Sequence, residues 1–290
     1  MIALKTIHCP VDFSPATPRQ VDLAADLCRA FGARLVLHHN RQLLGLGPSV
    51  GWMWHADHRE AQAAAEAKLR DCMSRVPEGV PVDVLLTDGP TSRMMLAVGE
   101  AVKADLVLLT AHETMSDEHA SITGRVLDQG DRAVLVLHEP AVEPRTPRFA
   151  TRPDEPQAVL ASTDLTARSG PAIDLGIDLA RALAIELHLI HVLPDARRGG
   201  GRDRAAEDEA RRQMRALVPD DLAARVTLHV ERGGPAEGIA RVADRLSAVC
   251  IVMGERPKHP LRRWFSRDTS RAVLHRARCP VWYVPTTRAS

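Results

Sequence analysis

The sequence has few aromatic residues and no excess of charge of either sign. Phe, Trp and Tyr together make up 3% of the 290 residues, and the formal net charge is +1 at pH 7. A near-neutral chain lacks the overall field that draws proteins to nucleic acid or to anionic membrane surfaces. We therefore expect neither nucleic acid nor a membrane among its partners. Apolar residues at 45% and charged residues at 26% are typical of a folded globular protein.

Long hydrophobic runs and metal-ligand cysteine spacings are also missing. No apolar stretch approaches the roughly 20 residues that span a bilayer, and the first residues show no secretory signal pattern. The cysteines form no CxxC pair or similar spacing, which argues against a zinc site and against a disulfide framework. The sequence thus predicts a cytoplasmic protein without a bound metal, whose thiols are reduced. The five cysteines are Cys9, Cys28, Cys72, Cys250 and Cys279.

The chain contains one sequence plan twice. The segment IHCPVDFSPATPRQVDLAADLCRAFGARLVLHH at 7–39 parallels VLASTDLTARSGPAIDLGIDLARALAIELHLIH at 159–191. Matching residues in a fixed order over this length indicate duplication of one domain. Because a histidine recurs at the end of both segments, we interpret it as structural. At a constant offset of 152, the matched pairs include Asp12 with Asp164, Arg29 with Arg181, and His39 with His191.

A proline-rich linker separates the two copies. Residues 140–156, PAVEPRTPRFATRPDEP, hold five prolines and show no hydrophobic period, which is typical of an extended connection. We therefore predict a first domain over 1–139 and a second over 157–287. The first domain carries an individual insert at 41–60, RQLLGLGPSVGWMWHADHRE, which we interpret as a lid or interface loop.

Short apolar strands alternate with amphipathic helices in each copy. In the second copy the expected strands are AVLAST, ELHLIHV, RVTLHVE, AVCIVMG and PVWYVP, separated by helices at about 168–184, 203–217, 235–246 and 268–276. Near-continuous apolar strands are buried on both faces, so helices must cover both sides of a parallel sheet. This pattern predicts an α/β fold of two tandem doubly wound domains.

Several segments together resemble the universal stress protein family in its tandem form. They are PVDFSPA and LAADLCRAFGARLVLHH in the first copy, and GGPAEGIARVADRLSAVCIVMG and RAVLHRARCPVWYVP in the second. The resemblance implies a five-stranded parallel sheet in each domain. It also implies that the fifth strands pair across a dimer interface, which a tandem chain satisfies within itself as an intramolecular pseudo-dimer.

The same resemblance locates a nucleotide site. Many family members bind ATP between the ends of the first and fourth strands, through a loop of the form Gly-x-x-Gly, nine residues, then Gly-Ser/Thr. Glycines there expose backbone N–H groups to phosphate. In the second copy Gly254 fills the first glycine position, but Pro257, which has no N–H, fills the second. Arg267 and Asp268 stand at the final Gly-Ser/Thr positions.

The first copy departs from the loop pattern as well. Thr110 and Glu113 stand at its first two glycine positions, and only Ser121 keeps the phosphate-contacting residue type. Asp12 and Asp164 remain at the ends of the first strands, where relatives contact the adenosine end. We favour a second interpretation, in which each carboxylate caps or hydrogen-bonds the turn that follows it. The candidate ligand-binding residues are therefore Asp12, Asp164, Gly254 and Ser121.

The sequence leaves three functions open. The preferred interpretation is a non-enzymatic stress-response or signalling module with degenerate nucleotide loops and no bound cofactor. The second is an ATP-binding protein in which arginines of the basic stretch 256–278 replace the lost glycine N–H groups; slow hydrolysis would fit this second case. The third is a scaffold that binds a protein partner through Trp52 and Trp54 of the insert. A homodimer is a further open alternative.

Overall fold

The computed structural model describes residues 4–41, 51–111, 122–138, 157–195, 200–255 and 267–285. Within them, the side chains of 51–58, 200–203, 255 and 267–268 are not described. The chain forms two compact units. The amino-terminal unit comprises Ala3–Thr110 and Thr114–Gly130, and the carboxyl-terminal unit consists mainly of Asp131–Ser290. The predicted linker 140–156 lies outside the described residues.

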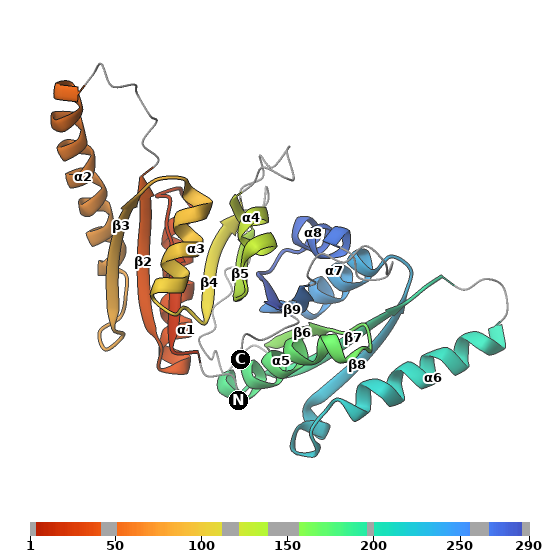
Figure 1. The fold of residues 1–290 in the computed structure, drawn as a ribbon. Helices are drawn as coiled ribbons and strands as arrows, with labels where there is room; N and C mark the ends of the chain where they lie inside the picture. Colours follow the sequence, from red (N-terminus) through yellow and green to blue (C-terminus); the bar gives the residue numbers. More distant parts are fainter. Residues whose placement is uncertain are drawn as a thin grey trace. The chain divides into compact units, whose positions relative to one another are not determined.

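The amino-terminal unit contains a four-stranded parallel sheet in the order β3-β2-β1-β4. Because parallel strands need crossover connections, a helix follows each strand (Figure 1). Right-handed crossovers place α1 and α2 on one face of the sheet and α3 and α4 on the other. The elements are β1 (Thr6–Pro10), α1 (Thr17–Phe31), β2 (Arg34–Arg41), α2 (Gly51–Ser74), β3 (Val82–Asp88), α3 (Thr91–Ala101), β4 (Leu106–Ala111) and α4 (Ile122–Gln129).

The carboxyl-terminal unit holds the strand order β5-β10-β9-β6-β7-β8. All its neighbouring strands are parallel except β5 and β10, which run antiparallel. The predicted elements of the second copy are confirmed. Its elements are β5 (Ala133–His138), β6 (Ala158–Ser162), α5 (Gly170–Leu183), β7 (Glu186–Leu193), α6 (Gly200–Ala216), β8 (Val226–Arg232), α7 (Pro235–Leu246), β9 (Cys250–Glu255), α8 (Arg267–Arg276) and β10 (Val281–Pro285), with short 3-10 turns at Ala167–Ser169 and Asp220–Arg225.

Strand β5 joins the two copies. It belongs to the first repeat in sequence, yet it pairs with β10 of the second, with Val136 opposite Val281 and Val134 opposite Tyr283. Trp282, opposite Leu135, is completely buried at this seam. Two fifth strands therefore pair within one chain. This pairing confirms the intramolecular pseudo-dimer that the resemblance implied.

Helix α2 corrects the expectation that the insert 41–60 is a loop. Residues from Gly51 onward are helical and continue to Ser74, while 42–50 lie outside the described residues. Among the described side chains, the buried ones are Ala65, Leu69 and Cys72, spaced four and three residues apart. That spacing forms one narrow apolar stripe facing the sheet. Sequence reasoning missed the helix because the segment before this stripe has no such period.

Candidate functional site

The carboxyl edge of each parallel sheet carries the candidate site. In sheets of this kind ligands bind where the strand order reverses, beyond the carboxyl ends of the strands. That point lies between β1 and β4 in the amino-terminal unit, and between β6 and β9 in the carboxyl-terminal unit. The structure places Asp12 just beyond β1 and Asp164 just beyond β6. Gly254 lies near the end of β9, opposite Val284 of β10.

The carboxylate of Asp12 accepts hydrogen bonds from the turn that follows it. Its Oδ1 atom lies 2.9 Å from the backbone nitrogen of Ser14 and 3.2 Å from Oγ1 of Thr17, the first residue of α1. An aspartate that accepts the N–H two residues ahead forms an Asx turn. This bond guides the chain from β1 into α1.

Asp164 makes a denser version of the same turn. Its Oδ1 atom accepts the backbone N–H of Thr166 at 3.0 Å, and the hydroxyls of Thr166 and Ser169, each at 2.6 Å. The Asp164 N–H in turn donates to the Ser169 hydroxyl oxygen at 3.0 Å. Both aspartates predicted as ligand-binding residues are thus already bonded to the chain by one carboxylate oxygen.

The residue after each aspartate adopts a left-handed backbone conformation. Phe13 has a φ angle of 60° and Leu165 one of 59°. Residues with a Cβ atom seldom occupy this region, because Cβ crowds the following carbonyl. The strain recurs at equivalent positions of the two copies, so it belongs to the repeated architecture. Sequence reasoning missed it because neither Phe nor Leu signals positive φ.

The repeated histidines have a structural role, as predicted. Nδ1 of His39 lies 2.8 Å from the carbonyl oxygen of Val11, and Nδ1 of His191 lies 2.9 Å from that of Thr163. Each ring donates to the backbone just before the aspartate and fixes the strand end there. In the amino-terminal unit the His39 ring also packs against Phe13, with 4.1 Å between ring centroids.

Gln20 closes the gap between β1 and β4. The register pairs these strands as far as His8 with Val107. Beyond that point, the buried Gln20 amide donates to the carbonyl oxygens of Pro10 at 2.7 Å and Leu108 at 2.9 Å. The equivalent residue in the second copy is Ala172, so the feature is specific to the first. A lone glutamine in a helix gives no sequence signal of such a bridge.

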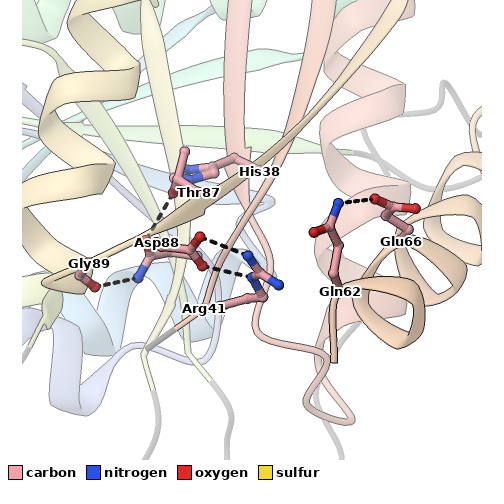
Figure 2. Close-up of polar contacts among 8 residues, drawn as sticks. His38, Arg41, Gln62, Glu66, Thr87, Asp88 and Gly89 are labelled. Atoms are coloured by element: carbon pink, nitrogen blue, oxygen red, sulfur yellow. Dashed lines mark hydrogen bonds and ion pairs between the residues drawn. The ribbon is translucent and has the colours of Figure 1, made fainter. Parts of the chain in front are cut away.

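A polar network occupies the ends of β2 and β3 (Figure 2). Nε2 of His38 lies 2.7 Å from Oγ1 of Thr87, which donates to Oδ1 of Asn40 at 2.9 Å. The Asn40 amide reaches the carbonyl oxygen of Gly89, at 2.9 Å, just before α3. The network therefore connects the buried interior of the sheet to the start of a helix.

Arg41 and Asp88 form a two-pronged ion pair beside this network (Figure 2). Nε and one terminal nitrogen of Arg41 each lie 2.7 Å from a different carboxylate oxygen of Asp88. The Arg41 side chain is only 10% exposed. Planar bidentate pairs are the strongest form of this contact. This one joins the last residues of β2 and β3.

The phosphate-loop positions fall largely beyond the described part of the chain. Ser121 lies outside the described residues, directly before α4, and 256–266 lie outside them as well. Helix α8 begins at Arg267, so Asp268 is its second residue. Among the described residues, no group of three or more His, Cys, Asp or Glu side chains could hold a metal ion. Within the same residues, no helix is long and apolar enough to cross a membrane.

The strand order, the parallel register and the repeated strand-end aspartates define a tandem doubly wound α/β protein. A sequence model of the universal stress protein family matches residues 3–138 and 156–285, so the chain belongs to this family, with two copies of its domain.

Solved structures agree with this fold. A universal stress protein from Archaeoglobus fulgidus DSM 4304 is 16% identical, with a TM-score of 0.68 and 98% of each chain covered. A protein of unknown function from Pseudomonas aeruginosa PAO1 is 17% identical, with a TM-score of 0.67, covering 98% of this chain and 93% of the other. A search among curated proteins finds no match.

Proposed function

We propose that this chain is a non-enzymatic stress-response module whose two nucleotide loops no longer hold a phosphate chain. The position of Asp268 as the second residue of α8 carries the proposal. A helix N-terminus attracts anions because its first N–H groups are unpaired and its dipole is positive there. A carboxylate in the first turn supplies that negative charge from the protein itself. It also repels a triphosphate that approaches the same helix end.

The turn bonds of the strand-end aspartates support the same conclusion. Asp12 and Asp164 stabilise the turns after β1 and β6 through Ser14, Thr166 and Ser169. These turns need an acceptor whether or not a ligand binds. Retention of both aspartates is therefore explained by folding, and the loop residues decide whether nucleotide binds. Pro257, which has no N–H to offer, supports loss of binding in the second copy.

Nucleotide titration tests the proposal directly. Purified protein is denatured and extracted to detect co-purified nucleotide, and the native protein is then titrated with ATP and magnesium by calorimetry and thermal melting. A ligand at a hundredfold over its Kd raises stability by roughly 2.7 kcal/mol. We expect no co-purified nucleotide and no melting shift up to millimolar ATP. Stoichiometric nucleotide or a clear shift would contradict the proposal.

A restored loop supplies the positive control. The triple variant Pro257→Gly, Arg267→Gly, Asp268→Ser returns the family's residue types to the second copy. We expect this variant to gain ATP-dependent stabilisation that the natural sequence lacks. Asp244→Ser removes the same charge from an exposed position of α7 and should gain nothing. Gain in both variants would show that removal of an acidic side chain anywhere on the unit, and not the restored loop, controls binding.

A remodelled adenine-nucleotide site is the second candidate. The observation in its favour is the recurrence of an aspartate followed by positive φ, at Phe13 and Leu165, on both sheet edges. Strained backbone conformations cluster at ligand sites. If ATP binds the natural sequence, Asp12→Asn and Asp164→Asn made separately will show which copy holds it.

The insert is the third candidate surface, for a protein partner or a second copy of the chain. Trp52 and Trp54 fall in the first turn of α2, where side chains are not described. The double variant Trp52→Ala, Trp54→Ala should abolish partner capture or dimerisation if this surface is used, and should leave nucleotide titrations unchanged. Unchanged capture would remove the insert from consideration.

A further inference from the structure

Two cysteines of the carboxyl-terminal unit lie on neighbouring segments of the sheet. Cys250 is the first residue of β9, and Cys279 occupies the bend just before Pro280 and β10. The backbone N–H of Ile251 donates to the carbonyl oxygen of Pro280 at 3.0 Å, and Ile251 stands opposite Val281. Cys250 thus directly precedes Ile251, the donor of this hydrogen bond, and Cys279 directly precedes Pro280, the acceptor.

This register brings the backbones of the two cysteines within the range that a disulfide spans. Adjacent strands lie about 4.8 Å apart, and Cys279 stands one residue, about 3.3 Å, before Pro280, the residue opposite Cys250, so the two Cα atoms are roughly 5.8 Å apart. A disulfide joins Cα atoms that are roughly 4.4–6.8 Å apart. Cys279 lies in a bend, so the alternation of a strand does not fix the direction of its side chain. Cys250 is also close enough to respond to its neighbour: burial, and then the charge of Cys279, raise the pKa of Cys250 well above its ordinary value.

The two thiols differ in access to solvent. Cys250 is completely buried, whereas Cys279 is partly exposed. The three other cysteines, Cys9, Cys28 and Cys72, are all buried in the amino-terminal unit. Oxidation of cysteine follows thiolate character and exposure. Cys279 is therefore the thiol that a dissolved oxidant reaches, and Cys250 is the neighbour that can resolve it.

We propose that Cys279 and Cys250 form a peroxide-responsive thiol pair that closes to an intramolecular disulfide. The Cys279 thiolate attacks hydrogen peroxide, takes one oxygen to become a sulfenic acid, and releases hydroxide, which leaves as water after protonation. The Cys250 thiolate then attacks the Cys279 sulfur, forms the S–S bond and expels a second hydroxide, which also leaves as water. Two thiols lose two electrons and two protons, and one peroxide is reduced to two waters.

The proposal has a structural consequence. The disulfide connects the start of β9 to the segment between α8 and β10, so it encloses β9 and α8 in a covalent loop. Closing a loop restricts the unfolded chain more than the folded one. Oxidation is therefore expected to raise the melting temperature of the protein. Because the Cys250 thiol resists ionisation, the second step is the slower one, and the sulfenic acid persists long enough to be trapped.

Peptide mapping after peroxide treatment tests the pair. Full-length protein is treated with hydrogen peroxide, alkylated without reduction, digested and analysed by mass spectrometry, with dimedone added in parallel to trap sulfenic acid. We expect a linked peptide containing Cys250 and Cys279, a dimedone adduct on Cys279, and a rise in melting temperature that a reductant reverses. Peroxide-treated protein with both thiols still reduced, with Cys279 over-oxidised, or with Cys279 linked to a second chain would overturn the proposal.

Three variants separate the disulfide from general effects of oxidation. Cys279→Ser should remove both the linked peptide and the melting shift, and its partly exposed position keeps the risk to folding small. Cys250→Ala should prevent closure and leave Cys279 as a stable sulfenic acid or a mixed disulfide. Cys72→Ala, at a buried position of the other unit, should behave as the natural sequence does. A melting shift that survives Cys279→Ser would assign stabilisation to another thiol.

Discussion

Nε2 of His8 lies 3.0 Å from Nδ1 of His38 in the buried interior of the amino-terminal sheet. One nitrogen must donate and the other accept, so the bond forms between two neutral rings or between one neutral and one protonated ring. A second pair joins Nδ1 of His188 to Nε2 of His229, at 2.8 Å, in the carboxyl-terminal unit. Both pairs bridge neighbouring strands. Neither can take up two protons and keep its hydrogen bond.

These pairs make stability dependent on pH. Burial, and then the charge of His39, lower the pKa of His38 to about 4; burial, and then His188, lower that of His229 to about 4. Unfolded histidine titrates near pH 6.5, so the unfolded state binds more protons between these values. The contribution of these rings to the free energy of unfolding is therefore fully present above about pH 6.5, and it is lost as the pH drops toward 4. For His38 the loss at pH 4 is roughly 3 kcal/mol.

Urea unfolding measured at several pH values between 7.5 and 4.5 checks this dependence. The variant His38→Asn should reduce the slope, because it removes one titrating ring while keeping an amide near the Nδ1 position that bonds His8. His275→Asn changes an exposed histidine of α8 and should leave the slope unchanged. Stability that is constant or rising toward pH 4.5 would contradict the assignment of neutral pairs.

Gln20→Leu should destabilise the amino-terminal unit. The substitution keeps the buried volume similar but leaves the carbonyl oxygens of Pro10 and Leu108 without their donor. A buried polar group that loses its partner costs about 1–3 kcal/mol. The matched control is Gln62→Leu on the exposed face of α2, where Gln62 bonds Glu66 one turn away. Chemical denaturation of both variants measures the difference, and equal effects would show that the Gln20 bridge contributes nothing.

Arg41 and Asp88 should couple more strongly than a surface ion pair. The bidentate geometry and the 10% exposure of the Arg41 side chain reduce screening by solvent. A double-mutant cycle with Arg41→Ala and Asp88→Ala is expected to give a coupling free energy of about 1 kcal/mol or more. The comparison cycle uses Arg29 and Asp26, whose ion pair of 2.9 Å spans one helical turn, with Arg29 55% exposed. It should give less than about 0.5 kcal/mol.

The elements that the sequence predicted best are those with a local pattern. Apolar strands, helix periods and the offset of 152 predicted the second copy, its Asp164 turn and the structural role of His191. The pseudo-dimer followed from family resemblance and was confirmed by β5 and β10.

Features that depend on register were not predictable in the same way. The His8–His38 pair exists because Pro10 stands opposite His38, which places His8 diagonally across from it. The Gln20 bridge exists because β1 and β4 separate after His8 and Val107. Such contacts join residues distant in sequence, and no local pattern reports them. The helical start of α2 was missed for a different reason, since its first residues lack an apolar period.

The two copies differ at the end of their first helix, where one has glycine and the other alanine. The resulting difference in backbone strain can be measured as a difference in stability. Gly32 ends α1 with a φ angle of 65°, and its equivalent Ala184 ends α5 with a φ angle of 54°. Glycine adopts this conformation without penalty, whereas a Cβ atom costs roughly 1 kcal/mol there. Ala184 is exposed, so removal of its methyl group loses little packing. A Cβ added at Gly32 would meet no other atom within 4 Å, so strain alone opposes it.

Reciprocal exchange at these two positions should therefore change stability in opposite directions. Ala184→Gly is expected to stabilise the carboxyl-terminal unit by about 0.5–1 kcal/mol, and Gly32→Ala to destabilise the amino-terminal unit by about 1 kcal/mol. Ala182→Gly, at an exposed position inside α5, should destabilise by about 0.5–1 kcal/mol because the helix interior disfavours glycine. Urea midpoints for the three variants measure these effects. If Ala184→Gly loses stability as Ala182→Gly does, backbone entropy outweighs the left-handed strain, and the second copy has adapted to alanine at its helix end.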